Sequence, residues 1–398
     1  MKLGSWLPEG GTNLFQDIKA MCAEAEAGGV KLLKLSIGQP TGPALVSARR
    51  GAASAVMDEE EDMHGYQDNE SPGVPGFAQR FVQAFVPCDL SGAKVSHLPI
   101  PGIKPMLGLV PLACGCYLDD WPSGFRAALM TKPGYPTPRN WCDYLQLHYQ
   151  ELPLHPRNSF RFSTDDIRKP THLIMMNYPH NPSGQTASRR WLEELCGFCE
   201  NYDIRLFNDA AYVPLTHRRT SCTLAEVAIN FPDLSWLEAY SASKAVGNGT
   251  GWRVGAMVGS PDFVKDLSTI KGNTDSGFVA FSAAGVIDAV EHDIGGMGQH
   301  RRAFGHRLKI LIQSLTAHGM QLAVQPGAGF FTLWKVPKGA FGEEVVDAEH
   351  FNRLMIERTG VVGVHFNPDY IRYAVVGDVE AMLPEIDEAF AEAAISYN

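Results

Sequence analysis

The segment Leu173–Phe207 reads LIMMNYPHNPSGQTASRRWLEELCGFCENYDIRLF and decides the fold class. It opens with a short apolar run, Leu173–Met176, continues through a helix-like amphipathic stretch, Ser188–Tyr202, and ends with a second apolar run, Ile204–Phe207. A strand, a helix and another strand in this order are typical of a unit whose strands are parallel. The segment therefore predicts an α/β fold with a mainly parallel sheet.

The same alternation of strand and helix patterns continues beyond this segment, and after residue 280 longer helical patterns replace it. The apolar run Val254–Val258 is followed by an amphipathic stretch, Asp262–Lys271, which predicts one more strand and helix. After residue 280 the patterns predict a smaller α+β region, with helices at Phe281–Thr316, Ala348–Thr359 and Pro384–Ala394 and strands at Gly329–Lys335 and Tyr370–Val376. No long Gly/Ser/Pro linker divides the chain, so we expect two domains that share a continuous path.

Composition and charge exclude several classes of protein. The chain has 398 residues, 45% of them hydrophobic and 20% charged, which is enough apolar material for a large core. The net charge is −10 and the basic residues are scattered, so nucleic acid is a poor partner. Residues 1–13 hold no apolar signal region, and Lys104 and several prolines interrupt the longest apolar stretch, Leu98–Leu118. We therefore expect a cytoplasmic protein without membrane association. The eight cysteines are spread thinly along the chain, so we expect no metal site from them.

Four short motifs carry the chemistry. They are Asn177–Gly184 (NYPHNPSG), Asn208–Tyr212 (NDAAY), Ser241–Lys244 (SASK) and Gly251–Gly255 (GWRVG). Three of them follow or end strand-like runs, and side chains in such places converge on a ligand at the carboxyl edge of a parallel sheet. Each motif alone is weakly specific.

In this order and spacing the motifs resemble those of the class I/II aminotransferases, which are fold-type I pyridoxal-phosphate enzymes. The resemblance extends from about Leu35 to Arg372. It implies a large domain at 46–279 with a mainly parallel seven-stranded sheet, and a smaller α+β domain formed by both chain ends, 1–45 and 280–398. It also implies pyridoxal 5′-phosphate as the cofactor.

The resemblance assigns four residues to the cofactor ring. Lys244 would form an imine with the cofactor aldehyde and move the proton between Cα and C4′, since an amine can do both. Asp209 would pair with the pyridinium nitrogen, while Tyr212 and Asn181 would contact the phenolic oxygen. Taken alone, Lys244 would be read as a surface lysine and Asp209 as a turn or helix cap.

A second group of residues is assigned to the phosphate and to the face of the ring. Ser241 and Arg253 resemble the family's phosphate ligands, together with the turn Gly102-Ile103-Lys104, whose amides we expect to open a helix towards the anion. Tyr135 matches the aromatic residue that stacks on the pyridine ring, although packing in the core would explain it as well.

The remaining assignments concern the substrate and a second subunit. Arg372 matches the arginine that binds the substrate α-carboxylate in two parallel hydrogen bonds, and Gly38 and Asn181 would help to hold that group. Tyr66 resembles the residue that crosses a dimer interface to reach the neighbouring subunit's phosphate. The resemblance therefore implies a homodimer.

The chain departs from the family pattern in three places. The interval from Lys244 to Arg253 is one residue longer than usual. The phosphate turn has Ile103 where a hydroxyl residue is common. After Tyr66 the family is often Gly-rich, whereas this chain has QDNES at 67–71.

The implied reaction moves an amino group between an L-amino acid and a 2-oxo acid, with glutamate and 2-oxoglutarate as the expected pair. The stretches Thr12–Phe15, Leu35–Gly38 and His64–Tyr66, with Lys104, are similar to those of LL-diaminopimelate aminotransferases. The sequence leaves open the specific amino acid, the pathway and the residue that binds the distal end of the substrate.

Three alternatives remain at this stage. A lyase or decarboxylase of the same fold would use the same cofactor without a keto-acid acceptor. A dinucleotide-dependent oxidoreductase is suggested by Gly247–Gly251, but these glycines miss the G-x-G-x-x-G spacing and follow a polar segment. A non-catalytic relative could keep the fold as a binding module.

Overall fold

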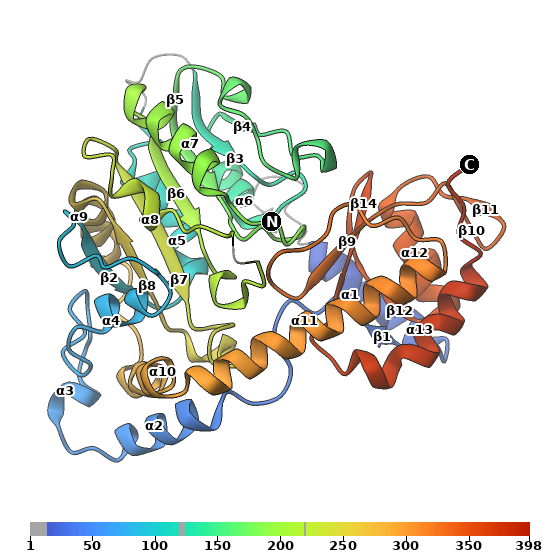
Figure 1. Ribbon diagram of the computed structural model, residues 1–398, viewed down its shortest axis with the longest axis horizontal. Helices are drawn as coiled ribbons and strands as arrows, with labels where there is room; N and C mark the ends of the chain where they lie inside the picture. The colour runs from blue at the N-terminus through green and yellow to red at the C-terminus, as the bar shows by residue number, and fades with distance from the viewer. Residues whose placement is uncertain (1–13, 119–123, 219) are drawn as a thin grey trace, which may run out of the picture.

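The structure is a computed structural model that describes residues 14–118, 124–218 and 220–398. Thr12 and Asn13, which belong to one of the family-like stretches, lie outside these ranges. Figure 1 shows two lobes joined by a long helix. The larger lobe contains a seven-stranded sheet in the order β2-β8-β7-β6-β5-β3-β4. Its strands are β2 (Ser96–Ile100), β3 (Phe125–Leu129), β4 (Tyr149–Glu151), β5 (Thr171–Met176), β6 (Arg205–Asp209), β7 (Trp236–Ser241) and β8 (Gly255–Gly259).

The predicted parallel sheet is confirmed for five neighbouring strands. β4, β3, β5, β6 and β7 run parallel, and β8 runs antiparallel to both β7 and β2. In the segment that decides the fold, β5 and β6 pair so that Met176 lies opposite Asn208, with helix α7 (Arg189–Asn201) between them in sequence. The carboxyl ends of β5, β6 and β7 therefore meet at one edge of the sheet.

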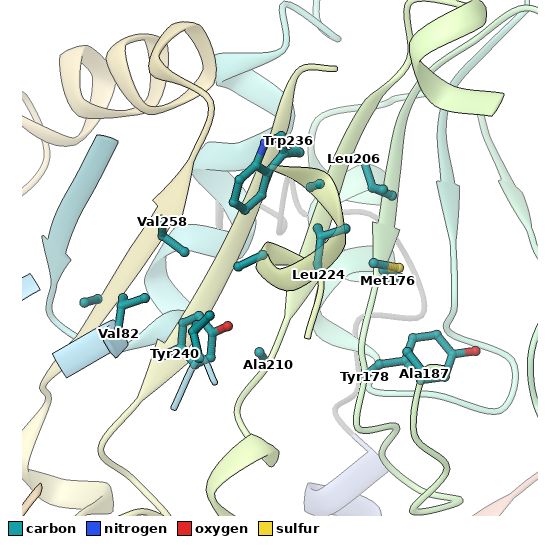
Figure 2. Packing of buried hydrophobic residues seen from close by; sticks show 14 of the residues in the cluster. Val82, Met176, Tyr178, Ala187, Leu206, Ala210, Leu224, Trp236, Tyr240 and Val258 are labelled. Atoms are coloured by element: carbon teal, nitrogen blue, oxygen red, sulfur yellow. The ribbon is translucent and has the colours of Figure 1, made fainter. Parts of the chain in front are cut away.

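Buried strand residues alternate between the two faces of the sheet. Trp236 and Tyr240 of β7, with Leu206 of β6, belong to one apolar cluster, which Figure 2 shows with Leu224 and Val258. Leu237 and Phe207 belong to the cluster on the other face. The first cluster includes residues of α2 (Val46–Val56), α4 (Phe77–Gln83), α7, α8 (Ala225–Ala228) and α10 (Ala280–His292), and the second includes residues of α5 (Ile103–Ala113), α6 (Thr137–Tyr144) and α9 (Pro261–Lys271).

The smaller lobe is built from both ends of the described chain. β1 (Leu33–Lys34) pairs in parallel with β12 (Val361–Val362), and α1 (Leu14–Ala27) packs on α12 (Ala348–Thr359). A three-stranded antiparallel sheet, in the order β13-β14-β9, supplies the rest of the frame. The strands of this sheet are β9 (Phe331–Lys335), β13 (Val364–Phe366) and β14 (Tyr370–Ala374), and the lobe also contains β10 (Gly339–Ala340), β11 (Glu343–Glu344) and α13 (Val379–Ala393).

Two helix predictions need correction. The single helix expected at Phe281–Thr316 is two helices, α10 and α11 (Ile294–Ala317), because the Asp293 carboxylate accepts a hydrogen bond from the Gly296 amide and starts a new helix. The last helix begins at Val379 rather than at Pro384, since Asp378 accepts a hydrogen bond from the Ala381 amide and caps it earlier. Across the described ranges, no helix combines the length and apolarity needed to cross a membrane.

Candidate active site

A cavity of about 490 Å³ opens where β5, β6 and β7 end. Asn177, Asp209 and Ser241, which stand at or just after the ends of these strands, all line it. The structure brings together eleven of the residues singled out in the sequence: Gly38, Ile103, Lys104, Tyr135, Asn181, Asp209, Tyr212, Ser241, Lys244, Arg253 and Arg372. Gly102 stands directly before Ile103, whereas Tyr66 is not part of the lining.

Lys244 follows β7 and lines this cavity. The amine lies 5.4 Å from the centre of the Tyr212 ring. Burial lowers the pKa of Lys244 to about 8; the Asp209 carboxylate opposes the shift and the Arg253 charge adds to it. A lysine with this pKa is partly unprotonated near neutral pH and can act as a nucleophile or a base.

Asp209 ends β6 and is buried. Burial raises the pKa of its carboxyl to about 6, against the lowering effects of the Ala211 amide and of Lys244. Its Oδ1 accepts a hydrogen bond from the Ala211 amide at 3.1 Å, as a turn cap would. Among the described residues, no lysine, arginine or histidine forms an ion pair with this carboxylate, so it has capacity to bind a cationic nitrogen of a ligand.

Arg372 is a buried guanidinium in β14 with incomplete hydrogen bonding. Its Nη1 donates to Asn181 Oδ1 at 2.8 Å and its Nη2 donates to the Ser36 carbonyl at 3.1 Å, while Nε has no partner among the described residues. The guanidinium lies 4.0 Å from the centre of the Phe331 ring, and burial lowers the pKa of Arg372 to about 10. A buried cation without a carboxylate partner is suited to an anionic ligand.

Donors for a second anion also line the cavity. Gly102 has a φ of 85° and precedes the first turn of α5, whose free amides begin at Ile103. A Cβ on Gly102 would lie 2.5 Å from Arg253 Nη2, so glycine allows the guanidinium to approach the turn. Arg253 itself donates to the Thr250 and Pro101 carbonyls. The longer interval after Lys244 therefore leaves Arg253 at the cavity.

Four polar lining residues were not singled out in the sequence as site residues. The Ser243 hydroxyl accepts a hydrogen bond from Ser241 at 2.8 Å, and its place in the Ser-x-Ser-Lys motif was a usable signal. Asn177 donates to the Asp209 carbonyl, and it opens the NYPHNPSG motif. Thr250 and Gln39 face each other at the cavity, with 3.5 Å between Thr250 Oγ1 and Gln39 Oε1. This contact depends on the loop at 247–251, and no sequence pattern indicates it.

The donor set fits pyridoxal 5′-phosphate. The cavity offers an amine, a buried carboxylate, and a cluster of amides, hydroxyls and a guanidinium that suits a phosphate. Residues 30–382 match the model of a family described as aminotransferase class I and II. The chain belongs to this family. It is a pyridoxal-phosphate-dependent aminotransferase, and the oxidoreductase suggested by Gly247–Gly251 is set aside.

Known relatives and structures agree with this aminotransferase family. LL-diaminopimelate aminotransferases from Syntrophobacter fumaroxidans and Moorella thermoacetica are each 28% identical to the chain, over 94% of both sequences. The aspartate aminotransferase of Rhizobium meliloti has a TM-score of 0.83 at 19% identity and covers 99% of each chain. An aminotransferase from Staphylococcus aureus has a TM-score of 0.79 at 21% identity, covering 93% of this chain and 95% of its own. These structures share the fold-type I architecture predicted from the sequence.

Proposed function

We propose that this aminotransferase acts on an amino acid with two carboxylates, with LL-diaminopimelate as the first candidate and glutamate/2-oxoglutarate as one substrate pair. The convergence of Lys244, Asp209 and Arg372 on one cavity carries the proposal. Lining cations outnumber lining carboxylates: Lys104, Lys244, Arg253 and Arg372 against Asp209. These four cations are assigned to the cofactor and to the substrate α-carboxylate, so the choice of a second carboxylate rests on the relatives named LL-diaminopimelate aminotransferases.

In the proposed chemistry, Lys244 would hold the cofactor through its amine; once displaced by the amino group of the substrate, this amine would move the proton between Cα and C4′. When bound, pyridoxal phosphate supplies an aromatic ring that accepts electrons from Cα. Asp209 would keep the ring nitrogen protonated, and its burial would strengthen this pairing because few solvent dipoles screen it. Tyr212 and Asn181 would donate to the phenolic oxygen, and Tyr135 would stack on the ring. Arg372 and Gly38 would hold the substrate α-carboxylate and so present Cα to Lys244.

The phosphate is assigned to the end of the cavity formed by Gly102-Ile103-Lys104, Ser241 and Arg253. We add Ser243 to this group, because its hydroxyl is hydrogen-bonded to that of Ser241 and lines the same cavity. Hydroxyls, helix-start amides and a guanidinium together satisfy a phosphate better than any one of them. The absence of a hydroxyl at Ile103 is offset by Ser243.

The active unit in this proposal is a homodimer in which Tyr66 reaches the neighbouring subunit's phosphate. Support comes from the exposed fraction of Tyr66, 80%, and from its place outside its own cavity. The division into a large domain at 46–279 and a small domain at 1–45 and 280–398 is part of the same proposal. A cytoplasmic location stays a prediction.

The test is an absorbance titration of the purified, cofactor-loaded protein with a panel of amino acids: LL-diaminopimelate, glutamate, aspartate and aromatic amino acids. We expect LL-diaminopimelate or glutamate to bleach the band of the bound cofactor, and added 2-oxoglutarate to restore it. Lys244→Ala should lose both responses while keeping the circular dichroism of the native protein, and Lys265→Ala, at an exposed position on α9, should keep them. A band that no dicarboxylic amino acid alters would refute the substrate class.

A further inference from the structure

Tyr66 combines an exposed side chain with a firmly held backbone. Its side chain is 80% exposed, whereas the next residue, Gln67, is 1% exposed. The Gln67 side chain donates to the Asp62 carbonyl at 2.7 Å and to the Gly65 carbonyl at 3.0 Å, and it accepts from the Gly73 amide at 3.0 Å. The exposed ring of Tyr66 therefore stands on a loop whose backbone is held in one conformation.

A buried lysine that the proposed chemistry does not use also contacts this loop, at residues 68 and 69. Lys271, the last residue of α9, is 0% exposed. Its amino group donates to Asp275 Oδ1 at 2.7 Å, to Asn69 Oδ1 at 3.1 Å and to the Asp68 carbonyl at 3.2 Å. A protonated lysine has three N–H donors, so each donor finds one oxygen.

The segment after Lys271 closes on the same loop. The Ser276 carbonyl accepts hydrogen bonds from the amides of Gln67 and Asp68. Gly277 has a φ of 92°, and a Cβ there would lie 2.7 Å from the Asp68 amide nitrogen, so the two segments lie too close for a side chain. The segment at 67–69 is therefore fixed by α9 and by residues 271–277.

The family departure after Tyr66 has a physical explanation in these contacts. Glycines would leave the loop without side-chain hydrogen bonds, whereas Gln67 and Asn69 supply them. Burying an amino group is costly unless it is fully hydrogen-bonded, so the contacts of Lys271 commit the loop to one conformation. Figure 1 shows α3 (Glu61–His64), which leads into this loop, at the edge of the large lobe away from the small lobe.

We propose that Lys271 is a positioning residue that holds Tyr66 in the orientation needed to reach the phosphate site of a second copy of this chain. The inference rests on the proposed role of Tyr66 between subunits. Lys271 contacts neither the cavity nor Tyr66 directly, and acts through Asn69 and the Asp68 carbonyl. Its effect on the cofactor should therefore be seen in the other subunit.

A double-mutant cycle measures whether the two residues act together. The dissociation constant of pyridoxal phosphate is determined by titrating cofactor-free protein for wild type, Tyr66→Phe, Lys271→Met and the double variant. We expect each single variant to weaken cofactor binding by roughly tenfold, the scale of one hydrogen bond to a charged group, and the double variant to be no weaker than the worse single variant. Lys265→Met is the matched control, because Lys265 is exposed on the same helix.

Asn69→Ala provides a second variant if Lys271→Met does not fold. It removes the contact with Lys271 and the hydrogen bond from Asn69 Nδ2 to the Ser268 carbonyl, and it leaves the lysine with two partners. We expect the same loss of cofactor affinity as for Lys271→Met. When Tyr66→Phe is already present, Asn69→Ala should cause no further loss.

Hybrid dimers separate action between subunits from simple destabilisation. Chains carrying Lys244→Ala are mixed with chains carrying Lys271→Met, and the mixed dimer is purified through two different tags. In this mixed dimer, the site that keeps Lys244 belongs to the Lys271→Met chain. The Tyr66 that reaches this site comes from the Lys244→Ala chain, whose Lys271 is intact. We expect this site to bind the cofactor with wild-type affinity, one per dimer, and to transaminate at the wild-type rate.

The outcomes distinguish the inference from the proposal beneath it. If Tyr66→Phe alone leaves cofactor affinity unchanged, the role of Tyr66 between subunits fails and the inference falls with it. Two outcomes would overturn only the positioning role of Lys271. In the first, Tyr66→Phe weakens cofactor binding, but its effect multiplies with that of Lys271→Met. In the second, the hybrid site binds the cofactor as weakly as the Lys271→Met dimer does.

Discussion

Lys244 and Asp209 share a buried cavity, and each changes the protonation of the other. The Asp209 charge raises the pKa of Lys244, but burial and the Arg253 charge lower it, which leaves the pKa of the amine at about 8. In the cofactor-free protein, the unprotonated amine is the form that attacks an aldehyde. The pH dependence of cofactor capture therefore reports on this pair.

We expect the rate at which cofactor-free protein captures pyridoxal phosphate to rise with pH, with a midpoint near 8 rather than near the ordinary lysine value of 10.5. Asp209→Asn removes the negative charge that stabilises the ammonium form, so the midpoint should move to lower pH. Stopped-flow absorbance across a pH series measures both. A midpoint that is unchanged or higher in Asp209→Asn would contradict the electrostatic account of this pair.

Arg372 gives a prediction about substrate recognition. Lysine is a single-point donor that cannot reproduce the two parallel hydrogen bonds of a guanidinium. Arg372→Lys should lower kcat/KM for an α-amino acid by roughly 10- to 100-fold, the scale of one or two charge-assisted hydrogen bonds. Arg372→Lys should cause no such loss for the matching primary amine, which has no α-carboxylate. The control variant Arg353→Lys, on α12, should not lower kcat/KM for the amino acid. An equal loss for amine and amino acid would remove Arg372 from carboxylate binding.

At the scale of residues, short motifs predicted most of the cavity, and what they missed depends on folding at a distance. Lys244, Asp209 and Arg253 come from segments whose residue types are chemically demanding, so the sequence indicates them. Gln39 and Thr250 are ordinary polar residues that meet only because the chain near residue 44 pairs with the loop at Gly247. No local pattern records that pairing.

Among the elements, the Asp293 cap between α10 and α11 contributes to the free energy of unfolding by an amount that can be measured. The Asp293 carboxylate accepts from the Gly296 amide at 2.8 Å and from the Ser47 hydroxyl at 2.6 Å, which joins the start of α11 to α2. Asp293→Ala should lower the free energy of unfolding by roughly 1–2 kcal/mol, as measured by urea denaturation. Ser47→Ala should add little once Asp293 is absent, since its partner is gone. Asp288→Ala, whose contact with His292 is exposed, is the control and should change stability by less than about 0.5 kcal/mol.

The elements show why periodicity predicts types better than ends. The single helix expected at Phe281–Thr316 spans Asp293, so the helical period alone predicts one helix where the capping carboxylate makes two. The amphipathic pattern predicts a helix start at Pro384, yet Pro384 lies inside α13, which Asp378 caps so that it begins earlier, at Val379. Strand positions were closer, since β5 and β6 each contain most of their expected runs. Periodicity depends on burial, whereas ends depend on single hydrogen bonds.

At the scale of the molecule, the α/β class and the parallel sheet followed from alternating apolar and amphipathic runs. The closure of the small lobe by both chain ends required the family resemblance, because β1 and its partner β12 are short and far apart in sequence. The same closure brings the Ser36 carbonyl to Arg372, so Arg372 is held by two distant parts of the chain, Ser36 and Asn181. The site thus depends on the complete fold.

A second subunit would extend this dependence to the dimer. If Tyr66 binds the phosphate in the neighbouring site, cofactor binding and subunit association are thermodynamically linked, and each must strengthen the other by the same factor. We expect the subunit dissociation constant, measured by analytical ultracentrifugation, to fall by roughly 5- to 150-fold when the cofactor is added. Tyr66→Phe should shrink this factor, because the ring without its hydroxyl cannot donate to the phosphate, whereas Tyr202→Phe, at another exposed tyrosine, should leave it unchanged. If wild type and Tyr66→Phe dissociate equally with and without cofactor, Tyr66 takes no part in the neighbouring site, and each subunit must complete its phosphate site from its own residues at Gly102, Ser241 and Arg253.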